Sequence, residues 1–214
     1  MITIYGVLRS RASRNVWLLH EMGREFRHVP VIQVGRLADP ASAINTRSAD
    51  FLAINPNGLI PSMDDDGLVL HESLAINLHL ARKYGGALGP ADAVEDSQMG
   101  MWTLWAATNV EPHSIQVLYN RAAKPVAERD AALADASVAA LRGPVAVLEL
   151  HLAQSGFLVG GRFTVADVNV AEVMRYALPA PELFTEAPAV RAWIAACHAR
   201  PAFKRMMAER DAEA

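Results

Sequence analysis

The chain is poor in cysteine, because Cys197 is the one cysteine among 214 residues. A single cysteine excludes an internal disulfide and a C-x-x-C redox pair. In a late helical stretch it is expected to be a small, buried or partly exposed hydrophobe. The seven histidines lack the H-x-x-x-H spacing of helical metal sites, and we predict no metal site.

The chain also lacks a surplus of positive charge and long apolar runs. Its 20 Lys and Arg against 23 Asp and Glu give a net charge of −3, which leaves no electrostatic footprint for nucleic acid. Residues 1–5 run straight into a strand-like pattern, without the basic flank and apolar core of a signal peptide. No apolar run reaches the length of a membrane span. We therefore expect a cytoplasmic protein without nucleic-acid or membrane partners.

Hydrophobic residues, by contrast, are plentiful, at 52% of the chain against 20% charged residues. This balance is typical of a globular protein with a substantial core and excludes intrinsic disorder. The length suffices for one large domain or two small ones.

The first third of the chain predicts a mixed α/β domain. Residues 2–7 alternate β-branched and aromatic side chains as a strand does, and residues 26–32 form a second strand pattern. A helix that begins at Ser13 or Arg14 and ends at Gly23 lies between them. A strand–helix–strand unit of this kind places its two strands parallel.

A hairpin and a helix complete this domain, for which we predict residues 1–84. Residues 60–63 form a short strand pattern, residues 64–67 an acidic turn ending in glycine, and residues 68–70 a returning antiparallel strand. A helix is expected over 72–84.

Residues 85–90, Gly-Gly-Ala-Leu-Gly-Pro, predict a linker, and residues 91–214 are expected to form an all-α domain. Helical patterns cover 94–120, 125–154 with a kink at Gly143-Pro144, 164–176, 188–198 and 201–209. Thr164-Val165-Ala166-Asp167 is a capping box before an apolar run. Asp167 is therefore predicted to be buried, to support folding and to take no part in catalysis.

The stretch Asn-Pro-Asn-Gly-Leu-Ile-Pro at 55–61, followed by His-Glu-Ser-Leu-Ala-Ile at 71–76, carries the clearest chemistry. It predicts a turn, a strand that starts at an X-Pro step, and a helix that opens at Glu72 and Ser73. The free N–H groups and dipole of a helix N-terminus attract a carboxylate. Ser73 can donate to that carboxylate and Glu72 can accept from an ammonium group. These residues are suited to the α-amino-acid end of a ligand.

Asn-Pro-x-Gly-x-x-Pro followed by Glu-Ser-x-Ala-Ile resembles the glutathione-binding half of the cytosolic glutathione S-transferases, and the resemblance extends over nearly the whole chain. It is closest to bacterial, serine-type, theta-like members. The resemblance implies a thioredoxin-like α/β N-terminal domain followed by an all-α domain. It also implies glutathione as co-substrate, a detoxifying transferase reaction and a homodimer.

Glutathione chemistry needs a thiolate, and a free thiol has a pKa of about 8.5. A hydroxyl that donates to sulfur and a helix N-terminus both lower that pKa. The spacing Ser10-Arg11-Ala12-Ser13-Arg14 matches serine-type relatives and makes Ser10 the first candidate. Ser13, which a plain N-cap role explains well, is the second. Tyr5 is the third, because other classes use a tyrosine near the first strand, although core packing explains it better.

The resemblance also places residues along the peptide part of glutathione. Pro61 resembles the cis-proline of the fold, whose turn lets the Ile60 backbone pair with an extended ligand. Glu72 and Ser73 hold the amino-acid end. Arg47 is a weaker candidate for a carboxylate contact, and Leu59 stands where many relatives carry glutamine or lysine.

For the electrophile, the resemblance implies an apolar pocket with a few polar groups. Its expected lining is Val7, Leu8, Trp105, Asn109 and His113. The last three are spaced i, i+4 on one helix face, although a core tryptophan and a half-buried histidine explain the pattern about equally well. The predicted reaction is addition of the glutathione thiolate to an apolar electrophile. The alternatives are a non-catalytic binding protein of the same fold, motivated by Leu59, or a glutathione-dependent peroxidase, disulfide reductase or dehalogenase.

Overall fold

The computed structural model describes residues 1–213, which divide into two compact units. Unit 1 comprises residues 1–86 together with the segment from Arg200 onward, and unit 2 comprises residues 87–199. The units are described separately below. The predicted order, an α/β region followed by a helical region, is confirmed.

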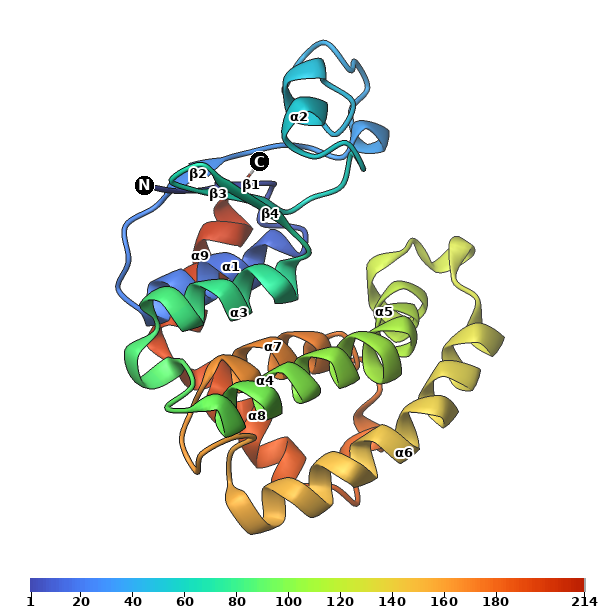
Figure 1. Cartoon of the computed structure of the whole chain (residues 1–214). Helices are drawn as coiled ribbons and strands as arrows, with labels where there is room; N and C mark the ends of the chain where they lie inside the picture. The colour runs from blue at the N-terminus through green and yellow to red at the C-terminus, as the bar shows by residue number, and fades with distance from the viewer. Residues whose placement is uncertain (214) are drawn as a thin grey trace. The chain divides into compact units, whose positions relative to one another are not determined.

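Unit 1 contains a four-stranded sheet in the order β2-β1-β3-β4. Its elements are β1 Ile2–Tyr5, α1 Ala12–Glu21, β2 Arg27–Val29, α2 Ala49–Ile54, β3 Ser62–Asp65, β4 Leu68–His71, α3 Ser73–Tyr84 and α9 Pro201–Ala212. Strand β1 runs parallel to β2 and antiparallel to β3, and β3 pairs antiparallel with β4. Helices α1, α3 and α9 lie on one side of this sheet and α2 on the other (Figure 1). The predicted parallel pair and hairpin are both confirmed.

The hairpin turn is tighter than the sequence pattern predicts. Strand β3 continues through Asp65, so that the loop consists of two residues, Asp66 and Gly67, with φ angles of 53° and 92°. Positive φ at both positions is the geometry whose twist matches that of the flanking strands, and Asp-Gly suits it. The turn therefore fixes the register that pairs Asp65 with Leu68.

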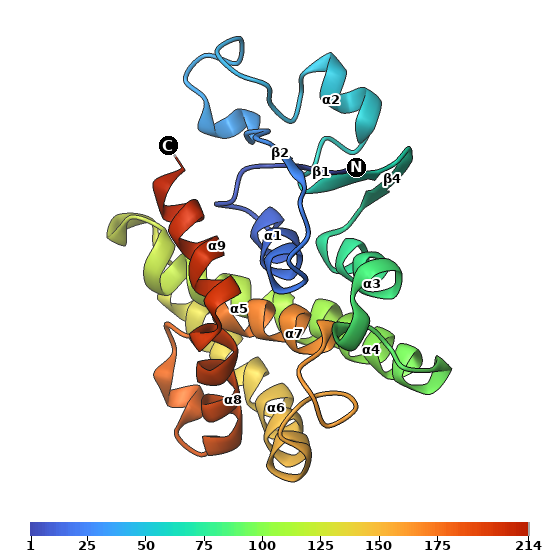
Figure 2. The ribbon, with the colours of Figure 1, turned by 90° about the vertical axis from the view of Figure 1, so that its left-hand side faces the viewer.

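Helix α9 packs on α1 within unit 1, whereas the sequence placed residues 200–213 with the helical domain. The indole of Trp17 and the ring of Phe203 meet edge to face, with centroids 5.0 Å apart. The Arg200 guanidinium donates to both carboxylate oxygens of Glu21 at 2.7 Å each. Figure 2 shows α9 beside α1. A helical pattern identifies an apolar face but not the partner of that face, which is why the sequence could not assign this helix.

Unit 2 is helical, with α7 as its central element. Its helices are α4 Ala93–Trp105, α5 Glu111–Leu118, α6 Ala131–Ser155, α7 Val165–Arg175 and α8 Pro188–Ala199. Residues 165–174 of α7 are all buried, and α7 contacts α4, α5 and α8. Cys197 on α8 is buried, as predicted.

The long helices begin and end differently from the prediction. The single helix expected over 94–120 is broken by π-helical turns at 106–110 and 119–123. Helix α6 starts at residue 131, where the Asp130 side chain accepts from the Leu133 N–H at 2.9 Å, and it contains Pro144. A π turn shifts the register of a helix face over a few residues, and no residue type in the sequence marks where it occurs.

One helix among the described residues, α6, is long and apolar enough to cross a membrane by length and composition. No apolar run of this length was expected from the sequence, and α6 corrects that expectation. The core helix of a soluble protein passes the same test. One such helix is weak evidence for a membrane span. Within unit 2, α6 packs against α5 and α8.

The capping box of α7 is confirmed, and Asp167 is fully buried. One carboxylate oxygen accepts from the Thr164 N–H at 2.8 Å. The other accepts from the Trp193 indole at 2.8 Å and from the Leu158 N–H at 3.1 Å. Burial raises the pKa of Asp167, while these neutral donors oppose the shift.

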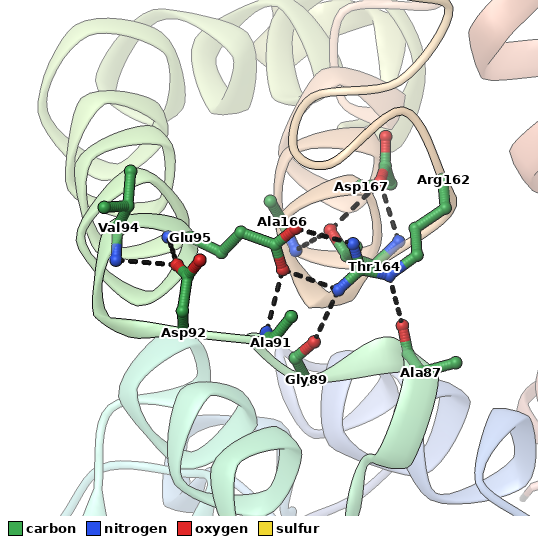
Figure 3. A network of polar contacts seen from close by, with 10 residues as sticks. All are labelled: Ala87, Gly89, Ala91, Asp92, Val94, Glu95, Arg162, Thr164, Ala166 and Asp167. Carbon is green, nitrogen blue, oxygen red and sulfur yellow. Dashed lines mark hydrogen bonds and ion pairs between the residues drawn. The ribbon is translucent and has the colours of Figure 1, made fainter.

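A second polar cluster ties the predicted linker region to the loop before α7. The Arg162 guanidinium donates to both oxygens of Glu95, at 2.7 and 2.6 Å, and to the carbonyls of Ala87 and Gly89 at 3.0 Å each (Figure 3). Glu95 also accepts from the Ala91 N–H at 2.8 Å. Hydrogen bonds from Arg162 and then from the Ala91 amide hold the pKa of Glu95 at about 2.

Candidate functional site

The loop between β1 and α1, residues 6–11, carries the serine that the sequence leads us to expect beside the thiol, and it is hereafter called the thiol loop. Ser10 is half-buried in it. Its hydroxyl donates to the Val7 carbonyl at 2.6 Å and accepts from the Ala12 N–H at 3.1 Å. Ser10 thus sits at the very start of α1, where the helix dipole and free N–H groups favour negative charge.

The two other hydroxyl candidates are placed differently. Ser13 is fully buried, and its hydroxyl donates to the Ser10 carbonyl at 3.0 Å, which is a local structural bond. Tyr5 is half-buried in β1, where it pairs with Val29 on one side and Ser62 on the other. Geometry therefore favours Ser10 among the three.

A buried polar network joins the start of α1 to the start of α3. The Arg14 guanidinium donates to the Ser73 hydroxyl at 3.1 Å. The Asn15 amide donates to the Ser73 carbonyl at 2.8 Å and to the Asn77 side chain at 2.7 Å. Because the Ser73 oxygen accepts from Arg14, its own hydroxyl proton remains available to donate.

An arginine in the first turn of a helix is ordinarily solvated or salt-bridged, and Arg14 departs from this pattern because it is buried. Arg14 is 1% exposed. Burying a guanidinium costs free energy unless it is hydrogen-bonded. The hydrogen bond to Ser73 offsets part of this cost, and it forms only when α1 and α3 pack together in the folded unit. Arg14 and Asn15 connect the start of α1 to the start of α3. The sequence did not indicate this role, because it shows only that both residues lie near the start of a helix.

Helix α3 begins at Ser73, with Glu72 as the flanking residue. Glu72 has φ 68° and ψ 108°, a conformation that costs a residue with a side chain of the order of 1–3 kcal/mol. Its side chain is exposed and makes no capping bond to the helix. The strained backbone therefore leaves the Glu72 carboxylate directed to solvent beside the first N–H groups of α3, where it can accept from an ammonium group.

The Ile60–Pro61 peptide bond is cis, as the resemblance implies. The carbonyl of the preceding residue, Leu59, accepts from the Asn55 amide at 2.8 Å, and the same amide nitrogen lies 3.1 Å from the Ser62 hydroxyl. The Leu59 side chain is 61% exposed. The Asn55 side chain thus holds the backbone of this segment, and the exposed Leu59 side chain does not contribute to holding it.

Two glycines allow close approaches around this segment. A Cβ on Gly6, with φ 135°, would lie 3.0 Å from the Ile60 Cβ. A Cβ on Gly58, with φ 60°, would lie 2.7 Å from both the Arg47 guanidinium and the Thr46 carbonyl. Glycine is needed at both positions. These contacts bring the thiol loop against Ile60 and place exposed Arg47 over the turn before Leu59.

The residues predicted for the electrophile divide between the units. Val7 and Leu8 lie in unit 1 and are buried. In unit 2, half-buried Trp105 meets Trp102 edge to face at 5.2 Å, exposed Asn109 donates to the Trp105 carbonyl at 3.3 Å, and His113 is half-buried on α5. The π-helical turn at 106–110 lies between Trp105 and His113, so the i, i+4 spacing of an uninterrupted α-helix does not hold across it.

In unit 1, the geometry provides a hydroxyl at a helix start, a second hydroxyl and a carboxylate at another helix start, and a fixed backbone segment between them. Such a set can bind a thiol-containing peptide: an extended backbone at Ile60, a terminal amino acid at α3 and a sulfur anion at α1. Among residues 1–213 no group of three or more histidine, cysteine, aspartate or glutamate side chains suited to a metal ion is found.

Both the N-terminal and the C-terminal parts of the chain match known protein families. Residues 10–83 match the glutathione S-transferase N-terminal domain and residues 105–201 match the C-terminal domain. Glutathione S-transferase 3 of Zea mays is 33% identical, with 97% of this chain and 93% of that protein covered. Glutathione S-transferase GstB of Escherichia coli is 32% identical, with 97% and 98% covered.

Solved structures agree. The structure of glutathione S-transferase III in apo form matches with a TM-score of 0.81 at 32% identity, covering 97% of this chain and 95% of that one. A theta class enzyme from Xanthomonas axonopodis pv. citri with glutathione bound matches with a TM-score of 0.81 at 28% identity, covering 95% of each chain. The chain therefore belongs to the glutathione S-transferase family, and its class of activity is glutathione transfer.

Proposed function

We propose that Ser10 stabilises the glutathione thiolate in this enzyme. The supporting observation is its half-buried hydroxyl just before α1, which accepts from the Ala12 N–H at the start of that helix. In the complex the hydroxyl turns from the Val7 carbonyl to donate to sulfur. The donor and the helix dipole together lower the thiol pKa from about 8.5, and the thiol proton passes to solvent.

The rest of the tripeptide is held by residues of unit 1. The proposed contacts are the Ile60 backbone next to Pro61 for the extended chain, and Glu72 and Ser73 for the terminal amino acid. Arg14 orients the Ser73 hydroxyl through the 3.1 Å bond described above. Arg47 is exposed beside Gly58 and is proposed for the other terminal carboxylate, with Leu59 contributing only backbone.

The thiolate then attacks an electrophilic carbon. Sulfur forms a bond to carbon, and a leaving group such as halide departs with the bonding electron pair. The proposed substrate is apolar, with Val7, Leu8, Trp105, Asn109 and His113 as candidates for its contacts. We place this reaction in the cytoplasm, as expected from the sequence.

The test combines binding with turnover for Ser10→Ala, with Ser13→Ala as the matched control. Calorimetry should show glutathione binding to all three proteins. Turnover of an aromatic halide should fall about 100-fold in Ser10→Ala, the usual effect of losing one donor to a developing anion, and little in Ser13→Ala. A greater loss in Ser13→Ala would exchange the roles. Binding without turnover in the wild type would leave a glutathione-binding protein of this fold.

We further propose a homodimer. Val94, Met101 and Leu104 are 65%, 55% and 65% exposed on α4, and their spacing places them along one side of the helix. Exposed apolar residues in such a row are typical of an interface. Sedimentation of the double variant Met101→Glu, Leu104→Glu should give monomers where the wild type gives dimers.

A further inference from the structure

The side chain of Glu213, after the end of α9, reaches the thiol loop. Its Oε2 accepts from the Leu8 N–H at 2.6 Å and lies 3.3 Å from the Arg9 nitrogen. Leu8 is 4% exposed, so its N–H depends on a protein partner. These two amides directly precede Ser10, more than 200 residues from Glu213 in sequence.

Arg9 makes the complementary contact. Its guanidinium lies 3.4 Å from the Arg210 carbonyl and 3.5 Å from the Asp211 carbonyl, at the C-terminal end of α9, where a cation is favoured. The loop backbone therefore binds the chain after α9, and a loop side chain binds the last turn of that helix.

Helix α9 itself packs on α1, the helix that directly follows the thiol loop. The Trp17–Phe203 and Glu21–Arg200 contacts lie near its start, and near its end His20 Nε2 meets the Glu209 carboxylate at 2.8 Å. The backbone that carries Glu213 is thus held at several points against the element whose N-terminus binds sulfur.

We propose that Glu213 is a positioning residue for glutathione transfer, acting through the Leu8 and Arg9 amides on the place of the Ser10 hydroxyl. This inference rests on the proposed role of Ser10. The Ser10 hydroxyl is bonded to Val7 and its backbone follows Arg9, so both sides of the residue depend on the loop that Glu213 holds. A displacement of about 1 Å at the reacting group is enough to lower a rate substantially.

The experiment is a double-mutant cycle with Glu213→Ala and Ser10→Ala, read as kcat/KM for an aromatic halide and as the apparent pKa of enzyme-bound glutathione from its thiolate absorbance. Glu213→Gln keeps an acceptor oxygen for the two amides. Asp211→Ala and Asp211→Asn remove the same charge from a side chain for which no bond to the loop is found in residues 1–213. Thermal unfolding of each protein controls for folding.

In the background that keeps Ser10, Glu213→Ala should lower kcat/KM about tenfold and raise the apparent pKa of the bound thiol. Glu213→Gln and both Asp211 variants should keep kcat/KM and this pKa near the wild-type values. In the Ser10→Ala background, Glu213→Ala should have no further effect. An equal effect in both backgrounds, or none with Ser10 present, would overturn the positioning role alone. Full turnover in Ser10→Ala itself would instead overturn the proposed function.

Discussion

Asp65 in unit 1 and Asp167 in unit 2 are both almost completely buried, yet they are stabilised by opposite means. Asp65 accepts from Lys83 at 2.8 Å, His79 at 2.8 Å and Tyr84 at 2.7 Å. Burial alone would raise its pKa, but these bonds, led by that from Lys83, hold it at about 2. The donors of Asp167 are backbone amides, a hydroxyl and an indole, and its pKa is raised.

The number of hydrogen bonds therefore does not decide in which direction the pKa of a buried carboxyl group moves. A cationic donor offsets the desolvation of a carboxylate, while neutral donors do so only in part. In unit 1 the carboxylate lies at the end of β3, where it ties the sheet to α3. In unit 2 the carboxyl group organises a helix start. The two therefore respond differently to truncation and to acid.

The largest effect is expected from Asp167→Ala. The change leaves the Thr164 and Leu158 amides and the Trp193 indole without their acceptor, so that unfolding free energy should fall by about 3 kcal/mol from cap loss and buried unpaired donors. Asp130→Ala removes the exposed cap of α6 and should cost about 1 kcal/mol. Denaturant unfolding at neutral pH measures both changes in unfolding free energy. Equal losses in the two variants would show that the burial of Asp167 adds nothing to the effect of losing a cap.

An intermediate effect is expected where the Arg162–Glu95 pair meets a glycine. Gly160 and Gly161 have φ angles of 65° and 61°, but a Cβ on Gly160 would lie 2.1 Å from the Arg162 guanidinium, whereas one on Gly161 would meet nothing within 4 Å. Gly161→Ala should cost about 1 kcal/mol for its left-handed backbone. Gly160→Ala should cost more, because Arg162 must move away from Glu95. Matched thermal unfolding curves would refute this if they coincided.

The smallest effect concerns acid. Because the folded pKa of Asp65 lies below its ordinary value of about 3.9, its stabilisation is complete above that value and is lost as pH falls from about 4 towards 2. The loss should be of the order of 1 kcal/mol, since Lys83 is partly exposed and water screens the pair. Asp65→Asn should flatten this part of the stability curve.

Asp167 contributes with the opposite sign. Its raised pKa favours the folded state as pH falls, so Asp167→Asn should steepen the acid loss that Asp65→Asn flattens. Urea unfolding from pH 5 to pH 2.5 on the two variants and the wild type measures the difference. Parallel curves for the two variants would remove the contrast between them.

Local patterns in the sequence were sufficient for the sheet, the hairpin, the capping box and the cis Ile60–Pro61 bond that the resemblance implied. Each depends on residues close together in the chain. The burial of Arg14, the π turn after Trp105 and the docking of α9 on α1 were not predicted. They depend on which surfaces meet in the folded unit, and hydrophobic periodicity does not carry that information.

The same distinction applies to the site. Glu72 and Ser73 were predicted because helix starts have recognisable residues. The choice of Ser10 and the assignment of all three to glutathione came from the resemblance, and they stay predictions. Glu213 was not found, since a lone glutamate near a helix end is an ordinary surface residue by pattern. Its contact with Leu8 joins segments that no local rule connects.

The packing of α9 on α1 has a consequence for how the protein is made on the ribosome. Trp17 emerges early, but its ring partner Phe203 is translated on the order of 20 seconds later, at roughly 10 residues per second. During that interval the nascent α/β unit lacks one of its helices, and its apolar Trp17 surface awaits a partner. Completion of this unit therefore waits until Phe203 has been synthesised, although most of its residues are synthesised before those of unit 2.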